Sequence, residues 1–464
     1  MKLKHHELEI DINNPFLNCK LNREQYADVL TQIVYNYADG FVLAINNEWG
    51  AGKTTFVKMW RQKLNYKDFK TIYFNAWEND YDSEPMVALL AELKNINPKD
   101  ATSTFKKVLK NSVTLSKNLF PILIQSLAEK YINTEIIKDA VNTITKEATQ
   151  LFEEEVIKYA DKKQSLDAFK IELGKYIQEE CNGKPLIFII DELDRCKPDY
   201  AVQVLECVKH FFSVPGIVFV LSIDKEQLCN AIKGFYGSES IDSANYLRRF
   251  IDIEYQIPSP SVKEFVDYLY EYFNLDEFFR HENRLKYDQL KRDHEYFKKY
   301  ASLIIDTKQL SLREQEKLFA YTRLILTQFE KNNFVLPTVL LTFIYVKQYK
   351  PVLYNKIELR KLEIAEFANE IEQVLKDYNG KELKVEYIFS LCLVCYNKYL
   401  EENHIHKQLI DVNIEPKKLL FKTNFNEDSV IYSIKSIDDS RGEAVSLSHL
   451  LDKINLTSQL VTLI

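Results

Sequence analysis

Residues 47–55 read Asn-Glu-Trp-Gly-Ala-Gly-Lys-Thr-Thr, and the short apolar run 41–45 lies just before them. This order predicts a strand that ends in a phosphate-binding loop and opens into a helix. The two glycines let backbone N–H groups surround an anion, because no Cβ blocks its approach. The helix that follows points its positive N-terminus at the same anion. The stretch therefore decides the fold, since it places a phosphate site at the end of a strand.

The polar residues of this loop match what a nucleoside triphosphate and Mg²⁺ require. We expect Lys53 to reach the β- and γ-phosphates and the Thr54 hydroxyl to bind Mg²⁺. The other predicted nucleotide contacts come from Asn47, Gly50, Ala51, Gly52 and Thr55. The predicted ligands are ATP and Mg²⁺.

The loop departs from the pattern G-x-x-x-x-G-K-[ST] at its first position, where Asn47 replaces a glycine. Asn is among the residues other than glycine that best tolerate a positive φ. We therefore interpret the segment as a variant of the loop. The alternative, a chance glycine-containing turn, is weakened by a second motif further along the chain.

The second motif is residues 185–195, which read Pro-Leu-Ile-Phe-Ile-Ile-Asp-Glu-Leu-Asp-Arg. An apolar strand here ends in two adjacent acids. We expect Asp191 to bind Mg²⁺, directly or through water, and Glu192 to polarise the attacking water as a general base. The alternative is a core strand with a polar end, which is disfavoured because the phosphate-binding loop precedes it.

Composition limits the class of protein. The chain has 464 residues, of which 46% are apolar, enough for two or three domains with hydrophobic cores. The 61 Lys and Arg residues are outnumbered by 68 Asp and Glu residues, which gives a net charge of −7. An acidic chain is a poor general coat for nucleic acid, although a local basic patch stays open.

The cysteines and the N-terminus bear on location. Seven cysteines at irregular spacing fit reduced thiols in the cytoplasm. Cys392 and Cys395 form a C-x-x-C, but without a second pair we favour a helix core over a metal site. No apolar signal core follows Met1, and no window reaches the roughly 18 apolar residues of a membrane span. We expect a cytoplasmic protein without a membrane span.

Strand and helix patterns alternate in the first half of the chain. Five strands are predicted, at 41–45, 71–75, 186–190, 217–222 and 251–257. Strands that alternate with helices imply a parallel sheet with both faces covered. Ligands bind such sheets at the carboxyl ends of the strands, where both motifs fall.

These patterns predict an α/β fold with a P-loop NTPase core, a long helical insertion between the P-loop and the acidic strand, and a C-terminal helical domain. The expected boundaries are 1–81 and 183–258 for the core, 82–182 for the insertion, 259–422 for the helical lid or C-terminal domain, and 423–464 for a tail. Ser311 and Glu314 form a capping box at a helix start. Residues 429–437 alternate enough to suggest a strand in the tail.

Four blocks, taken together, resemble the KAP family of P-loop NTPases over about residues 15–350. They read Trp-Gly-Ala-Gly-Lys-Thr at 49–54, Phe-Asn-Ala-Trp at 74–77, Ile-Asp-Glu-Leu-Asp-Arg-Cys at 190–196 and Tyr-Leu-Arg-Arg-Phe-Ile at 246–251. The second and third blocks are the specific ones. This chain departs from the family where Asn47 replaces a glycine and where Glu192 stands in place of a frequent second Asp.

The resemblance implies a bacterial ATPase, often linked to phage exclusion or defence, and related to ATPases that form rings or signalling oligomers. Many family members carry membrane spans between the nucleotide motifs, where this chain has polar helical patterns. No nuclease, deaminase or protease constellation is present, so an output activity would come from a partner protein. The alternatives are a non-catalytic ATP-dependent switch and, against the acidic balance, a DNA-translocating motor.

Further positions each have two interpretations. Residues 22–26 could wall in the adenine, which makes Arg23 a candidate nucleotide contact. They could instead form a capped surface helix, with Asn22 as N-cap and Gln25 at the third position. Trp77 could pack beside the nucleotide, but we favour a place in the core.

Polar residues also follow the third and fourth strands. Related ATPases often place a sensor of the γ-phosphate where Ser222 and Asp224 lie. We prefer the sensor role for Ser222 and an N-cap role for Asp224, with Gln227 at the third position of the helix. Asp194 and Arg195 could pair across a subunit interface or with each other.

Three arginines are candidates for contacts with the γ-phosphate. Ring ATPases can use an arginine near Arg248 and Arg249 to reach a neighbour's nucleotide, an interaction worth about 10³–10⁵ in rate. A salt bridge at a strand edge is the alternative. Arg313 lies in the first turn of a helix, where a cation opposes the helix dipole, which suggests that it faces a bound anion. A surface pairing with Glu314 or Glu316 is equally compatible.

Overall fold

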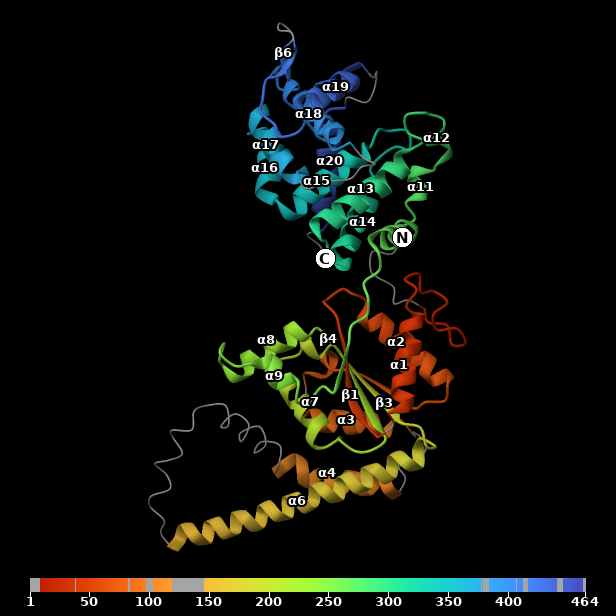
Figure 1. Cartoon of the computed structure of the whole chain (residues 1–464), viewed down its shortest axis with the longest axis vertical. Helices are drawn as coiled ribbons and strands as arrows, with labels where there is room; N and C mark the ends of the chain where they lie inside the picture. The colour runs from red at the N-terminus through yellow and green to blue at the C-terminus, as the bar shows by residue number, and fades with distance from the viewer. Residues whose placement is uncertain are drawn as a thin grey trace. The chain divides into compact units, whose positions relative to one another are not determined.

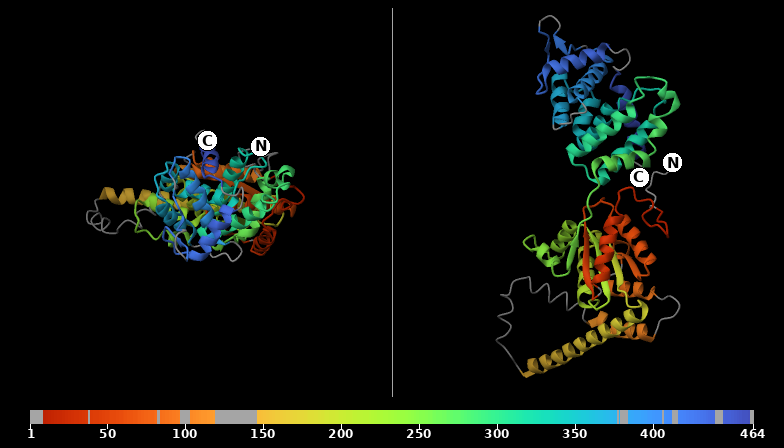
Figure 2. Two further views of the ribbon diagram at one scale, coloured as in Figure 1. Left: turned by 90° about the horizontal axis from the view of Figure 1, so that it is seen from above. Right: turned by 45° about the vertical axis from the view of Figure 1, so that its right-hand side comes forward.

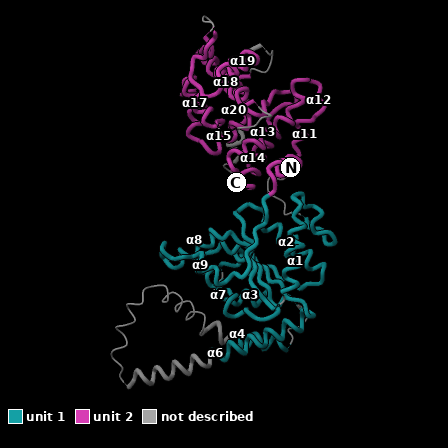
Figure 3. The backbone as a smooth tube through the Cα atoms, in the orientation of Figure 1, with its two compact units in different colours: residues 1–259 teal, residues 260–464 magenta. Residues whose placement is uncertain are grey.

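The computed structural model describes most of the chain, namely residues 9–37, 39–81, 84–96, 103–118, 146–376, 378, 384–405, 407–411, 416–439 and 445–461. The chain divides into two compact units, Met1–Ser259 and Pro260–Ile464 (Figure 3). Unit 1 is α/β, and unit 2 is almost entirely helical. The predicted fold class is confirmed.

Unit 1 is built on a five-stranded parallel sheet (Figure 1). The strands are β1 (Phe41–Asn46), β2 (Thr71–Asn75), β3 (Leu186–Asp191), β4 (Ile217–Ile223) and β5 (Ile253–Tyr255), in the order β2-β3-β4-β1-β5. Every residue of β3 and β4 is buried, as expected for apolar strands inside a covered parallel sheet. Asn46 pairs with Ile223 and Asp191 with Ser222, so both motifs leave the sheet at its carboxyl edge.

Helices cover both faces of the sheet. They are α1 (Glu24–Asn36), α2 (Lys53–Tyr66), α3 (Pro85–Lys94), α7 (Pro198–His210), α8 (Lys225–Tyr236) and α9 (Ser243–Leu247). One buried cluster joins α1 and α2 to the sheet through residues such as Leu30 and Trp60. A second cluster joins α3, α7 and α8 to the sheet through residues such as Leu89 and Leu205. The sheet is thus the middle of three layers.

The segment between β2 and β3 contains the predicted helical insertion. Besides α3 it holds α4 (Ser103–Asn118) and α6 (Lys146–Glu180), which lie side by side (Figures 1 and 2). Phe105 of α4 packs on Tyr176 of α6, with ring centroids 5.0 Å apart. Both residues belong to the buried cluster that joins α3, α7 and α8 to the sheet. These parts of α4 and α6 therefore belong to the core of unit 1.

Unit 2 is a helical assembly with a small antiparallel hairpin, β6 (Ile410–Asp411) and β7 (Lys418–Leu419). Its helices are α10 (Val262–Tyr272), α11 (Asp276–Phe279), α12 (Glu282–Leu285), α13 (Asp293–Lys308), α14 (Leu312–Leu326), α15 (Pro337–Tyr349), α16 (Pro351–Glu358), α17 (Ile364–Leu375), α18 (Val385–Glu401), α19 (Glu427–Asp439) and α20 (Ser448–Val461). The capping box of Ser311 and Glu314 is present at the start of α14, as predicted. No helix in the described part of the chain is long and apolar enough to cross a membrane.

Two sequence predictions about unit 2 have opposite outcomes. Cys392 and Cys395 are buried in α18, which confirms the helix-core interpretation, and burial raises the pKa of the Cys395 thiol to about 12. The strand predicted at 429–437 is wrong, because this segment lies in α19. The Asn426 side chain accepts a hydrogen bond from the backbone N–H of Ser429 at 2.9 Å, which caps the helix start. The residues Val430, Ile431, Ile434 and Ile437 are buried at helical spacing.

Candidate functional site

The loop between β1 and α2 has the backbone that a phosphate cradle needs. Gly50 has φ 86° and Gly52 has φ 76°, a left-handed conformation that favours glycine. A Cβ on Gly52 would also lie 2.9 Å from an Nη atom of Arg23. Gly52 caps α2 without a side-chain hydrogen bond, so the first N–H groups of the helix have no side-chain acceptor at this cap.

Asn47 has a different role from the one predicted. It is absent from the positive-φ residues, so its tolerance of that conformation is not used. Its side-chain amide instead donates to the carbonyl of Ile257 at 2.8 Å and accepts from the Ile257 N–H at 2.9 Å. The buried side chain thus imitates a strand partner and ties the start of the P-loop to the segment that follows β5.

Arg23 supports the P-loop through hydrogen bonds to its backbone. Its guanidinium donates to the carbonyl of Ala51 at 2.9 Å and to that of Gly52 at 3.3 Å. The residue is 6% exposed, and burial lowers the pKa of Arg23, although a guanidinium stays charged in proteins. The predicted cap at Asn22 is wrong, since α1 begins after Arg23 and Asn22 has φ 53°. The Arg23 side chain therefore binds the P-loop backbone, and the segment is not the capped surface helix of the alternative interpretation.

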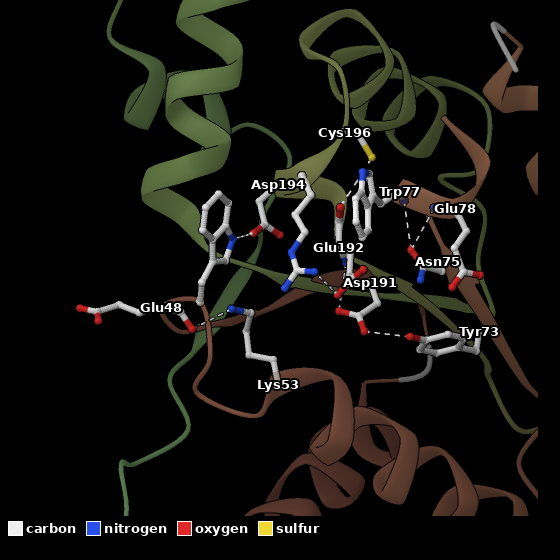
Figure 4. Close-up of polar contacts among 12 residues, drawn as sticks. Glu48, Lys53, Tyr73, Asn75, Trp77, Glu78, Asp191, Glu192, Asp194 and Cys196 are labelled. Atoms are coloured by element: carbon white, nitrogen blue, oxygen red, sulfur yellow. Dashed lines mark hydrogen bonds and ion pairs between the residues drawn. The ribbon is translucent and has the colours of Figure 1, made fainter. Parts of the chain in front are cut away.

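Lys53 lies inside the P-loop, as predicted. Its Nζ donates to the carbonyl of Asn47 at 2.6 Å. It also donates to the carbonyl of Glu48 at 3.1 Å, a contact that Figure 4 draws. Burial lowers the pKa of Lys53, while the charges of nearby carboxylates, led by Asp194, oppose that shift. An ammonium has three N–H donors, and two neutral carbonyls hold this one, so Lys53 has donors to offer to a phosphate.

Asp191 occupies the end of β3 and is almost fully buried. One carboxylate oxygen accepts from the backbone N–H of Glu192 at 3.0 Å, and the other accepts from the Tyr73 hydroxyl at 2.9 Å (Figure 4). Burial, followed by the charge of Asp191, raises the pKa of Tyr73 well above its ordinary value, so its hydroxyl remains a donor. The hydrogen bond from Tyr73, which lies in β2, thus helps to hold the Asp191 carboxylate in one orientation.

Glu192 follows with a left-handed backbone, φ 61°. Its Oε1 lies 2.8 Å from a guanidinium nitrogen of Arg195, three residues further on. Burial raises the pKa of Glu192, and the charge of Arg195 and a hydrogen bond from Asn75 oppose that shift. The predicted general base is therefore a mostly buried carboxylate held by one cation.

Two predictions about the neighbours of these acids are corrected. Asp194 and Arg195 do not pair with each other: Asp194 accepts from the indole N–H of Trp49, and Arg195 pairs with Glu192. Trp77 is 50% exposed, not a core residue. Its indole lies against the Arg195 guanidinium, because the chain turns into a short 3₁₀ helix after β2 and carries Trp77 to the surface.

At the end of β4, the predicted cap at Asp224 is confirmed. Asp224 caps α8 by accepting from the Gln227 N–H at 3.3 Å, and it also accepts from the Trp49 N–H at 3.2 Å. Ser222 is fully buried beside Asp191 in the sheet register, and its hydroxyl has no hydrogen-bond partner in the described part of the chain. A sensor role for Ser222 stays a prediction.

The three candidate arginines lie elsewhere. Arg248 and Arg249 are exposed and precede β5, which places them at the amino edge of the sheet, opposite the P-loop. The charge of Arg248 contributes to lowering the pKa of Glu254 in β5, after the larger effect of the Lys225 hydrogen bond. Arg313 is exposed at the second position of α14, in unit 2. Their nucleotide contacts stay predictions.

The donor set fits a magnesium nucleotide better than a bare metal ion. Among the described residues no group of three or more His, Cys, Asp and Glu side chains could hold a metal. The Asp191 carboxylate and the Thr54 hydroxyl are hard oxygen ligands of the kind that Mg²⁺ prefers, with phosphate oxygens supplying the rest. The left-handed glycines and the uncapped start of α2 provide the anion cradle.

Sequence reasoning missed the supporting side chains of the site. Tyr73, the hydrogen-bond partner of Asp191, was not recognised. Asn75 was missed as well: it hydrogen-bonds to Glu192, and its side chain accepts from the backbone N–H of Trp77 at 3.1 Å. The block Phe-Asn-Ala-Trp marked this segment, but the contact depends on β2 lying beside β3, with Asn75 opposite Asp191. No local pattern fixes that register.

The fold and this site define a nucleotide-binding P-loop domain. The chain belongs to the KAP family: the model of the KAP family P-loop domain matches residues 23–327, more than half of the chain. An uncharacterized protein of Methanocaldococcus jannaschii is 30% identical over 184 residues, covering 33% of this chain and 90% of that protein. The resemblance inferred from the motifs is confirmed.

Solved structures with lower similarity include two origin recognition proteins. A structure of Drosophila ORC bound to DNA has a TM-score of 0.34 and 13% identity and covers 96% of this chain and 87% of its own. The Aeropyrum pernix ORC2 protein with ADPNP and ADP has a TM-score of 0.33 and 14% identity, with coverage of 89% and 94%. At scores this low we base no argument on these structures.

Proposed function

We propose that this chain binds ATP with Mg²⁺ and hydrolyses the terminal phosphate. The observation that carries the proposal is that Lys53, Asp191 and Glu192 follow strands of one parallel sheet and gather at its carboxyl edge (Figure 4). Ligands of open parallel sheets bind at this edge. A cation within a glycine loop and two successive acids are the groups that phosphoryl transfer to water requires.

Each residue has a stated part in the reaction. The P-loop N–H groups and Lys53 bind the phosphates, with Lys53 exchanging its loop carbonyls for phosphate oxygens. Asp191 and Thr54 would hold Mg²⁺, which neutralises charge on the phosphate oxygens when it is bound. Glu192 accepts a proton from the attacking water, an effect worth roughly 10²–10⁴-fold.

The test compares binding with turnover. We expect Glu192→Gln to bind Mg·ATP in calorimetry and to lose phosphate release by roughly 10²-fold or more. Lys53→Ala should lose both. Glu226→Gln, an exposed carboxylate in the first turn of α8, is the matched control and should behave as the wild type. Undiminished phosphate release in both site variants would refute the assignment.

A second function, an ATP-dependent switch without useful turnover, is supported by one contact. The Glu192 carboxylate is engaged by Arg195 at 2.8 Å, and a general base must keep an oxygen free for water. Nucleotide that stays on the purified protein with negligible phosphate release would favour the switch. Steady release of phosphate would exclude it.

The proposed setting is bacterial anti-phage defence in the cytoplasm, through self-association and a separate effector protein. Family membership supports this setting. Light scattering with and without Mg·ATP measures the assembly, and phage plating on cells with wild-type protein or Lys53→Ala measures defence. Equal plating and a constant monomeric size would refute this part of the proposal.

Arg248 and Arg249 are proposed to act on a neighbouring subunit, since their edge of the sheet is opposite the P-loop of their own chain. Mixing inactive Lys53→Ala with an inactive Arg249→Ala chain should then restore part of the activity. No restoration would argue against a contact between subunits. Arg313 is proposed as a nucleotide contact from unit 2, and Arg313→Ala should weaken Mg·ATP binding.

A further inference from the structure

Arg195 lies between two tryptophans at the margin of the site. Its guanidinium is 5.9 Å from the ring centroid of Trp49 and 5.6 Å from that of Trp77. We call these three residues the Trp49–Arg195–Trp77 stack. The same guanidinium makes the 2.8 Å ion pair with Glu192. The stack therefore ends on the carboxylate proposed to activate water.

Each member of the stack is anchored to a different functional segment. Trp49 belongs to the P-loop, where its indole N–H donates to Asp194 and its backbone N–H donates to Asp224. Trp77 follows β2, and its N–H donates to the Asn75 side chain. Arg195 ends the short 3₁₀ helix after β3. One guanidinium thus connects three segments that are distant in sequence.

An ordinary surface ion pair would not fix a carboxylate in this way. Exposed pairs contribute little, because both side chains stay mobile and solvated. Here Glu192 is only 14% exposed at its side chain, and the guanidinium also lies over the rings of Trp49 and Trp77, which restrict its movement. Glu192 also has a left-handed backbone outside regular structure, so its side-chain partners, Arg195 and Asn75, have a large share in setting its direction.

We propose that Arg195 is a positioning residue for ATP hydrolysis: held between Trp49 of the P-loop and Trp77 after β2, it orients the Glu192 carboxylate and links its position to the P-loop. Arg195 touches neither nucleotide nor water in this role. The inference rests on the proposed hydrolysis and adds a residue to it. It also explains why two tryptophans are left partly exposed beside a buried site.

The first test separates positioning from binding. We expect Arg195→Gln to lower kcat roughly tenfold or more, because small displacements of a catalytic group have large effects on rate. Its affinity for Mg·ATP should stay within about twofold of wild type, since Lys53 and the P-loop are intact. Arg195→Lys should recover only part of the rate, because an ammonium lacks the planar face that stacks on indoles.

Two further variants complete the design. Trp77→Leu leaves Arg195 and the P-loop unchanged and should lower kcat by roughly threefold through loss of one stacking face. It keeps the proposal testable if Arg195→Gln fails to fold. Arg360→Gln is the matched control: this arginine also pairs with a glutamate, Glu402, at 3.0 Å and lies over the ring of Tyr399, but in unit 2. It should leave kcat unchanged.

Tryptophan fluorescence provides a readout that a purely structural role would not change. The chain has three tryptophans, and Trp60 is buried against Thr31 away from the stack. In the wild type, a non-hydrolysable ATP analogue with Mg²⁺ should change the emission of Trp49 and Trp77. Arg195→Gln should abolish most of that change while calorimetry still detects binding of the analogue.

The outcomes distinguish the two proposals. If wild type hydrolyses ATP, Glu192→Gln does not, and Arg195→Gln and Trp77→Leu match wild type, the positioning role is overturned and hydrolysis stands. If Arg195→Gln loses affinity and kcat together, the residue is structural and the proposal is again overturned. If wild type binds Mg·ATP without turnover, both proposals fail.

Discussion

The P-loop and the acid Glu192 are held in different ways. Two buried residues hold the P-loop: Arg23 is 6% exposed and Asn47 is 7% exposed. The Arg23 side chain bonds to the carbonyl of Ala51, and the Asn47 side chain bonds to the carbonyl of Ile257. Glu192 is held by Arg195, whose side chain is 33% exposed and lies between two partly exposed indoles. The phosphate cradle is therefore set by the folded core, whereas the carboxylate proposed as general base depends on contacts that solvent reaches.

This difference suggests a division of labour. Donors that are fixed before the ligand arrives need no reorganisation when charge must be stabilised. The Glu192 carboxylate is instead fixed by side-chain contacts at the margin of the site, so a change in those contacts alters its direction and leaves the phosphate cradle in place. The comparison predicts that damage to the P-loop side reduces stability, and also reduces binding where the lost contact was to the backbone of residues 51–52. Damage to the acid side should reduce the rate alone.

The largest effect is expected from Arg23→Met. This change removes the hydrogen bonds to the Ala51 and Gly52 carbonyls, the second of which is long at 3.3 Å. Hydrogen bonds to charged groups contribute about 1.5–3 kcal/mol each, and the Met variant recovers part of the loss because it no longer buries a charge. We expect the free energy of unfolding to fall by about 2–3 kcal/mol and the affinity for Mg·ATP to fall roughly 30- to 100-fold. Urea unfolding and calorimetry measure the two quantities.

The control for Arg23→Met is Arg292→Met in unit 2. Arg292 is exposed and pairs with exposed Glu295, so its loss should change stability by less than about 0.5 kcal/mol. An Arg23→Met chain with wild-type stability and affinity would remove the distinction between the two sides of the site.

Gly52→Ala should have the next largest effect. A Cβ at this position would lie 2.9 Å from the Arg23 guanidinium. The alanine backbone would also have to keep a φ of 76°. Residues other than glycine in such conformations cost about 1–3 kcal/mol, and we expect roughly tenfold weaker Mg·ATP binding.

Gly183→Ala separates backbone strain from the clash. Gly183 has φ 80° but nothing within 4 Å of its would-be Cβ, and it lies before β3, at the edge away from the P-loop. It should lose stability by about 1 kcal/mol without losing nucleotide affinity. Equal effects of the two alanines on affinity would contradict the bracing role of Arg23.

Asn47→Gly restores the glycine of the usual loop pattern and should nevertheless destabilise the chain. It removes two buried hydrogen bonds to Ile257, for an expected loss of about 1–2 kcal/mol in the free energy of unfolding. Affinity for Mg·ATP should change less than twofold, because the Asn47 carbonyl that meets Lys53 is backbone. Thermal unfolding beside calorimetry tests this, and a more stable Asn47→Gly chain would refute it.

What could be predicted from sequence follows a physical rule. The P-loop, the acids after β3, and the caps at Asp224 and Ser311 depend on residues close together in the chain, and these were found. The braces could not be found in this way, since Arg23 reaches across 28 residues to Ala51 and Asn47 across 210 to Ile257. Such contacts depend on sheet order and register.

Two wrong predictions, a strand at 429–437 and a core position for Trp77, also arise because tertiary contacts are not visible in the sequence. Residues 429–437 alternate in hydrophobicity but also carry apolar side chains at helical spacing, and packing against α18 decides for the helix. Trp77 was assigned to the core by its size and apolar character. The structure uses its face for the guanidinium of Arg195, a partner that neither composition nor periodicity reveals.

The smallest effect is expected on the acid side, from Tyr73→Phe. The phenol donates to Asp191 at 2.9 Å, and its loss leaves that carboxylate with the Glu192 N–H and its proposed contact with Mg²⁺. We expect kcat to fall roughly fivefold, about 1 kcal/mol, with little change in ATP affinity or in the free energy of unfolding.

The pH dependence of Tyr73→Phe follows from the direction of the Tyr73 shift. Burial raises the pKa of Tyr73, so the neutral hydroxyl persists as a donor through the working range. The ratio of the Tyr73→Phe rate to the wild-type rate should therefore stay constant from neutral pH to about pH 9, near the ordinary range of tyrosine ionisation. A ratio that rises toward one with pH would show that the wild-type phenol loses its proton there. A fall in affinity or stability as large as that of Arg23→Met would show that the acid side is braced like the P-loop, and the contrast between the two sides would no longer hold.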